Sequence, residues 1–61
     1  MYAIYWYAQM CMDWVPSERF PDTYDSAAEA LTAIRKKFGR QIHVRGNTVA
    51  TLGGDYAIME L

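Results

Sequence analysis

The chain has one cysteine and one histidine, Cys11 and His43, and these are its only candidates for a nucleophile and its general base. Such a pair is catalytic only when the two side chains are in hydrogen-bond contact beside donors that stabilise an oxyanion. Nothing in the sequence places them together, and 61 residues leave little room for such a pocket. An isolated cysteine more often packs as a small hydrophobe. We therefore predict no catalytic residues and expect that the protein is not an enzyme.

Motifs for metals and cofactors are also missing. One cysteine and one histidine are fewer ligands than a structural zinc site requires, and the carboxylates show no ligand spacing. Gly53-Gly54-Asp55 lacks the spacing and the following helix of a phosphate-binding loop. We expect no metal and no cofactor.

The cysteine content and the hydrophobic runs of the sequence indicate the cellular compartment. A lone cysteine favours a reducing setting, and no run resembles a signal peptide or reaches the ~18 apolar residues of a membrane span. We expect a cytoplasmic protein, without a membrane partner.

Aromatic and basic residues form the one constellation that could bind a macromolecule. Tyr5 and Tyr7 alternate on one face of the opening segment, and His43 and Arg45 alternate in a later one. Such a surface is typical of protein interfaces, and also of proteins that stack single-stranded nucleic acid. A net charge of −1 favours a protein partner. These four residues are the predicted partner-binding site, with nucleic acid as the alternative.

A second basic group follows in the sequence, formed by Arg35, Lys36, Lys37 and Arg40. It is a secondary candidate for a binding patch. The simpler interpretation is a solvated last helical turn, where cations complement the negative end of the helix dipole.

The opening segment, residues 1–15, holds both tryptophans and most of the methionines. Aromatic and β-branched density predicts a strand over residues 2–9, extending through a bulge or bend to about 14. Alternation assigns one row to the core and the other to a half-solvated face. The expected core row is Tyr2, Ile4, Trp6, Ala8, Met10, Met12 and Trp14.

The middle of the chain reads as a loop and a helix. Two prolines keep residues 16–24 out of helix, and Phe20 and Tyr24 are expected to pin this loop to the body. Ser26 and Glu29 match a capping box that opens a helix over residues 26–38. Its apolar stripe is followed by Gly39 as the C-terminal cap.

The remaining residues predict three strands. Gly46-Asn47 between β-branched runs indicates a hairpin of strands 41–45 and 48–52, with a type I′ or II′ turn. A final strand follows over residues 56–61. The expected fold is a single α+β domain of order β-α-β-β-β, in which one helix packs on one face of an antiparallel-rich sheet. The other face then stays bare.

Size bears on the partner. A 61-residue chain is near the lower limit for folding alone, and it can form no internal disulfide. We therefore expect a homo-oligomer, with a dimer favoured.

In outline the chain resembles short accessory proteins encoded by phages and prophages. The resemblance lies in the aromatic opening strand, the Ser-Ala-Ala-Glu-Ala helix start and the Tyr-Ala-Ile-Met-Glu-Leu ending. It implies a viral protein that binds and inhibits a host protein, including components of antiviral defence. No functional residue is implied by it.

Overall fold

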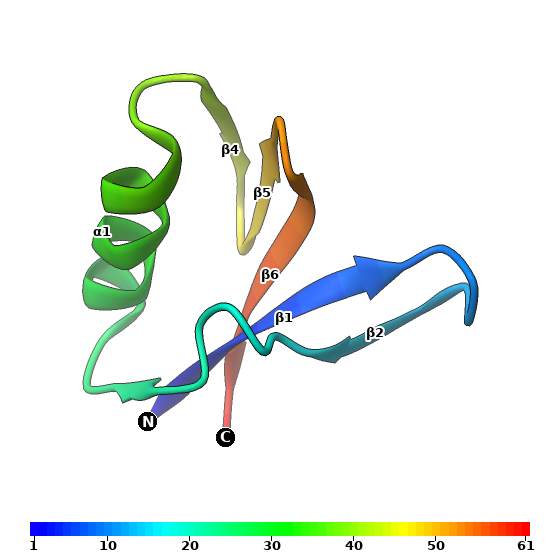
Figure 1. Ribbon diagram of the computed structural model, residues 1–61. Helices are drawn as coiled ribbons and strands as arrows, with labels where there is room; N and C mark the ends of the chain where they lie inside the picture. Colours follow the sequence, from blue (N-terminus) through cyan, green and yellow to red (C-terminus); the bar gives the residue numbers. More distant parts are fainter.

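The computed structural model describes residues 1–61 and shows one antiparallel sheet with a single helix on one face (Figure 1). This confirms the predicted α+β class. The elements in chain order are β1 (Tyr2–Ala8), β2 (Asp13–Pro16), β3 (Thr23–Tyr24), α1 (Ala27–Phe38), β4 (Ile42–Arg45), β5 (Thr48–Thr51) and β6 (Gly54–Glu60).

The strand order is β2-β1-β6-β5-β4, and the short β3 also pairs with β1. The first and last strands are therefore neighbours, and β6 is the middle strand of the five. The two ends of the chain lie together at one end of these two inner strands, where the Leu61 N–H donates to the Met1 carbonyl at 2.8 Å (Figure 1). The centre of the sheet is therefore formed by the two strands that are farthest apart in sequence.

The β4–β5 hairpin has the register that the sequence predicts. Val44 lies opposite Val49, and His43 lies opposite Ala50. Gly46 has a φ of 59°, whereas Asn47 is not among the residues of positive φ. A type II′ turn requires a positive φ at its first central residue only, so the structure selects this type.

The opening strand differs from the prediction, because β1 ends at Ala8 and the chain turns back. The Cys11 N–H donates to the Ala8 carbonyl at 3.1 Å, and the Met12 N–H donates to the Gln9 carbonyl at 3.3 Å. Met12 has a φ of 52°, a left-handed conformation that completes the reversal. The segment expected as an extension to about residue 14 is thus a turn and a second strand, β2.

This turn reverses which face each later residue occupies. Trp6 pairs with Val15 and Tyr7 with Trp14, so even-numbered β1 residues share a face with odd-numbered β2 residues. Trp14 therefore lies opposite to the face predicted for it. Met10 and Met12, also expected in the core, are 100% and 78% exposed at the hairpin tip, and Trp6 is partly exposed.

Local capping explains the bounds of α1. The Glu29 N–H donates to Ser26 Oγ at 3.2 Å, and the Glu29 carboxylate accepts from the Asp25 N–H at 3.3 Å. Gly39, with a φ of 70°, closes the other end by donating its N–H to the Arg35 carbonyl. The helix has 12 residues, and no helix is long and apolar enough to cross a membrane.

The core lies between α1 and one face of the sheet. Ala30 and Ile34 from the helix are fully buried, as is Val49 from β5. An aromatic cluster closes one end, where Phe20 packs edge-on against Tyr56 with centroids 5.4 Å apart. The buried core cluster comprises Ile4, Phe20, Ala30, Ile34, Val49, Tyr56 and Ile58.

The loop predicted at residues 16–24 is pinned by two aromatic residues as expected, since Phe20 is buried and Tyr24 packs against the core. Its ends differ from the prediction, because Pro16 belongs to β2 and Thr23–Tyr24 forms β3. The loop is ordered by Ser17, whose buried hydroxyl accepts from the Phe20 N–H at 3.2 Å.

Position 53 requires glycine because of side-chain packing, and its backbone conformation is an ordinary one. A Cβ added there would lie 2.8 Å from Phe38 Cε1. We predict that Gly53→Ala lowers the free energy of unfolding by about 1–3 kcal/mol through overpacking, measured by urea denaturation. In a Phe38→Leu background the same change should cost less, because the shorter side chain leaves room. An equal cost in both backgrounds would contradict this explanation.

Tyr24 gives the fold a dependence on alkaline pH. Burial raises the pKa of Tyr24 above its usual 10.0, and the nearby Asp22 carboxylate adds to the rise. The unfolded chain therefore loses this proton first, and the stabilisation that exists below pH 10 is lost as pH rises through the folded pKa. Tyr24→Phe should lose less stability than the wild type between about pH 9 and 11. Equal losses in urea titrations would contradict this assignment.

Candidate functional site

The face of the sheet away from α1 is uncovered, and we call it the open face. The strand registers arrange its side chains in two rows that cross the sheet. One row runs His43, Ala50, Asp55, Tyr7 and Trp14, with a break in pairing between Asp55 and Tyr7. The other runs Arg45, Thr48, Ala57, Tyr5 and Pro16.

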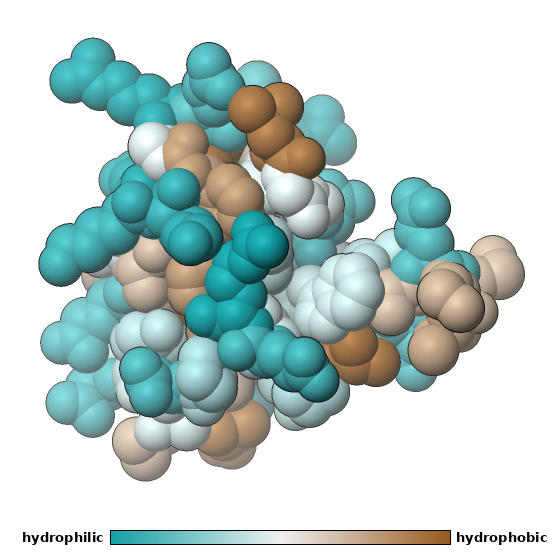
Figure 2. All heavy atoms as spheres, viewed as in Figure 1, coloured by the Kyte–Doolittle hydropathy of each residue, from teal (hydrophilic) through white to brown (hydrophobic).

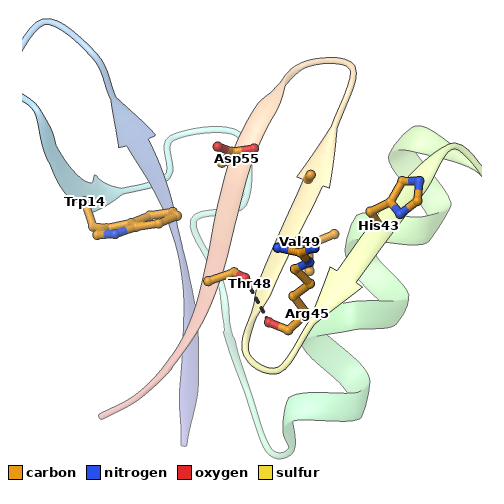
Figure 3. A pocket seen from close by; sticks show the side chains of 7 residues that line it. Trp14, His43, Arg45, Thr48, Val49 and Asp55 are labelled. Carbon is orange, nitrogen blue, oxygen red and sulfur yellow. Dashed lines mark hydrogen bonds between the residues drawn. The ribbon is translucent and has the colours of Figure 1, made fainter.

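A groove of about 460 Å³ lies on this face (Figure 3). Trp14 stands at one side of the groove and His43 and Arg45 at the other, with α1 behind the sheet (Figure 3). Small side chains on β5 allow the hollow between them. The lining residues are Trp14, His43, Arg45, Thr48, Val49, Ala50 and Asp55.

Trp14 is the site residue that sequence reasoning missed. Its ring packs edge-on against Tyr7, with centroids 5.4 Å apart and planes at 70°. The two residues are directly opposed in the β1–β2 ladder, where aromatic pairs interact well. A four-residue turn at Gln9–Met12 was the signal to find, but these residues lack the glycine, proline or Asn-Gly pattern that marks turns.

The structure places all four predicted binding residues on the open face. Tyr5 and Tyr7 come from β1 and are half-buried, whereas His43 and Arg45 come from β4 and are exposed. Two strands, β6 and β5, lie between these pairs, which is a separation of about 14 Å. The tyrosines and the basic residues therefore share a face without forming one contact cluster.

The groove contains both signs of charge. The Arg45 and His43 side chains rise from the edge strand β4, and the exposed Asp55 carboxylate stands on the central strand β6. The Arg45 side chain is exposed and its guanidinium makes no hydrogen bond or ion pair within the chain. The hydrogen bond at this residue involves its backbone carbonyl, to which Thr48 Oγ1 donates at 2.8 Å. A ligand here meets a cationic edge, an aromatic edge and one carboxylate between them.

The secondary basic patch lies elsewhere. Its first three members occupy the last turn of α1 and the fourth follows the helix, and all are exposed. Because α1 covers the opposite face of the sheet, this patch and the open face cannot contact one flat ligand together. Hydrophilic atoms cover the outer side of α1 at the left of Figure 2. Its members are Arg35, Lys36, Lys37 and Arg40.

Cys11 and His43 are assigned to different parts of the molecule. Cys11 is exposed in the β1–β2 turn, and His43 lies on β4 at the opposite edge of the sheet. No group of three or more His, Cys, Asp or Glu side chains is arranged to hold a metal ion. The geometry therefore brings no nucleophile and base together and assembles no metal site.

A second cleft, of about 680 Å³, occurs where the sheet forks. β1 and β6 pair as far as Trp6 and Tyr56 and then separate into the two hairpins. Hydrophobic atoms gather at the β1–β2 tip at the right of Figure 2. The walls are mostly apolar and are formed by Trp6, Tyr7, Ala8, Gln9, Met10, Cys11, Val15, Gly53, Gly54 and Asp55.

Fold and site together describe a small α+β protein with an uncovered aromatic sheet face. Comparison with protein-family models, curated proteins and solved structures finds no match.

The Tyr7–Trp14 contact should be measurable as a coupling free energy. A double-mutant cycle with Tyr7→Ala and Trp14→Ala should give about 0.5–1.5 kcal/mol beyond the sum of the single changes, measured by urea denaturation. The matched control is Tyr5→Ala with Trp14→Ala, because Tyr5 is opposed to Pro16 instead. Equal coupling in both cycles would contradict a specific edge-on contact.

Proposed function

We propose that this is a non-catalytic protein-interaction module that binds another protein through the open face. The observation that supports this most is the groove between Trp14 and Arg45, on a sheet face that no element of the chain covers. Tryptophan, tyrosine and arginine are the residues most enriched at energetically important interface positions. The partner is either a second copy of this chain or a foreign protein.

The amount of exposed surface supports an unfilled interface. The chain exposes 4514 Å² and buries only 10 of its 61 residues. A compact monomer of 7.0 kDa is expected to expose about 4,000 Å². The chain thus exposes about 500 Å² more than a compact monomer of its mass, an excess that belongs to the molecule as a whole.

The finer part of the proposal concerns the target. The resemblance to phage-encoded accessory proteins supports a viral inhibitor that acts in the cytoplasm of a host cell on a host defence protein. An inhibitor of this kind blocks its target by occupying a surface, which requires an exposed aromatic face and no catalytic group.

Single-stranded nucleic acid is the second candidate, and Trp14 is the observation that favours it. A tryptophan opposite a guanidinium offers one base to stack and one cation for a phosphate. The charge balance favours protein, because Asp55 stands in the same groove and the net charge is −1.

Replacing Tyr5 and Tyr7 with serine should abolish binding of the protein partner while the fold stays cooperative. The reason is that both side chains stand on the open face, where their half-buried rings supply much of the apolar contact area beside Trp14. The measurement is capture from host-cell lysate by the immobilised protein, with nuclease present, followed by mass spectrometry. Thermal unfolding of the variant checks the fold.

The control replaces two exposed apolar residues away from the open face, Met10→Ser with Leu52→Ser, and should leave capture intact. If this control loses capture and the tyrosine variant keeps it, the partner binds at the cleft where the sheet forks and not on the open face. Capture that disappears with nuclease and that weakens steeply with salt would instead favour the nucleic-acid function.

A further inference from the structure

The open face has two unlike halves on either side of its central strand. On β5 and β4 the side chains are small or cationic: Thr48, Ala50, His43 and Arg45. On β1 and β2 they are large and aromatic: Tyr5, Tyr7 and Trp14. Because β6 has two strands on each side, the halves have the same width, about 10 Å.

Two such faces fit each other if one copy is rotated by 180° about an axis along β6. This rotation exchanges the two halves, so β1 of one copy faces β5 of the other, and β2 faces β4. Positions along the strands are unchanged. The registers then set Tyr7 against Ala50 of the second copy and Tyr5 against Thr48. Large side chains meet small ones at both positions.

The same rotation also brings the β2 edge of one copy onto the β4 edge of the other. Trp14 then faces His43, because the two residues lie in the same row, and the rings of the indole and the imidazole can pack together. Arg45 faces Pro16 in the neighbouring row. At the centre, Ala57 on β6 presents only a methyl group and is already buried within its own chain, so the two sheets can approach to the usual ~10 Å.

We propose that a second copy of this chain occupies the open face, in a two-fold dimer whose axis follows β6. The inference rests on the proposed function, since it names the protein that this face binds, and a host protein can then occupy the same face only after the dimer dissociates. The five strands are four to seven residues long and give each copy a face of roughly 400 Å², so the pair buries about 800 Å², the size of a weak, transient interface.

One residue destabilises the proposed dimer, so replacing it should strengthen self-association. Asp55 stands on β6, next to the two-fold axis, so its carboxylate faces the Asp55 carboxylate of the second copy. Like charges at that distance repel. Asp55→Asn should therefore tighten self-association about fivefold, measured by sedimentation equilibrium across protein concentrations.

A size exchange tests the facing positions directly. Ala50→Trp places two large residues against each other and Tyr7→Ala leaves two gaps, so each variant alone should dissociate at least tenfold more readily. Mixed together they should form a heterodimer of nearly wild-type affinity. One of its two contacts sets the new tryptophan at position 50 against the new alanine at position 7, and the other keeps Tyr7 against Ala50. A mass-tagged copy separates the heterodimer from both parents by native mass spectrometry, and urea unfolding confirms that each variant is folded.

A chain that stays monomeric up to millimolar concentration would overturn the dimer, as would a dimer that neither tightens with Asp55→Asn nor recovers on mixing. The proposed function fails by a different result, retention of the lysate partner by the Tyr5→Ser, Tyr7→Ser variant. A monomer whose foreign partner is lost in that variant would assign the open face to the foreign protein.

Discussion

The fold depends on the pairing of its first strand with its last. β1 and β6 join the β1–β2 hairpin to the β4–β5–β6 meander, and without their ladder the two parts are held together only by the helix and by side-chain contacts such as Phe20 with Tyr56. Ile4 and Ile58 are opposed in this ladder and both are buried under α1. Closing a loop of nearly the whole chain costs conformational entropy before any contact is gained. We therefore expect the β1–β6 ladder to be the slow step of folding.

The helix explains why one face remains open. A 12-residue helix is about 18 Å long, which suffices for one side of a sheet this size and leaves nothing for the other. Every buried residue of the core cluster belongs to the helix side. The open face is thus the side of the sheet opposite the single helix, and its aromatic content separates it from the solvated face of an ordinary antiparallel sheet.

The β1–β2 turn connects the fold to the candidate site. It moves Trp14 from the core row to the open face, where the indole becomes a wall of the groove. It also leaves Met10 and Met12 exposed at the tip. The site therefore depends on a reversal within the most hydrophobic stretch of the chain.

Much of the local structure was determined by sequence alone. The bounds of α1 follow from Ser26 and Gly39, and the register of the β4–β5 hairpin follows from Gly46-Asn47, because each rests on hydrogen bonds between residues a few positions apart. Alternation grouped Tyr5 with Tyr7 and His43 with Arg45, and the strand order then placed both pairs on the open face. The tertiary structure decided the strand order, the turn after Ala8 and the place of Trp14. Methionine, alanine and glutamine have weak turn and strand preferences, so these residues alone do not determine where β1 stops; its end is the last pair of the β1–β2 ladder, Ala8 with Asp13.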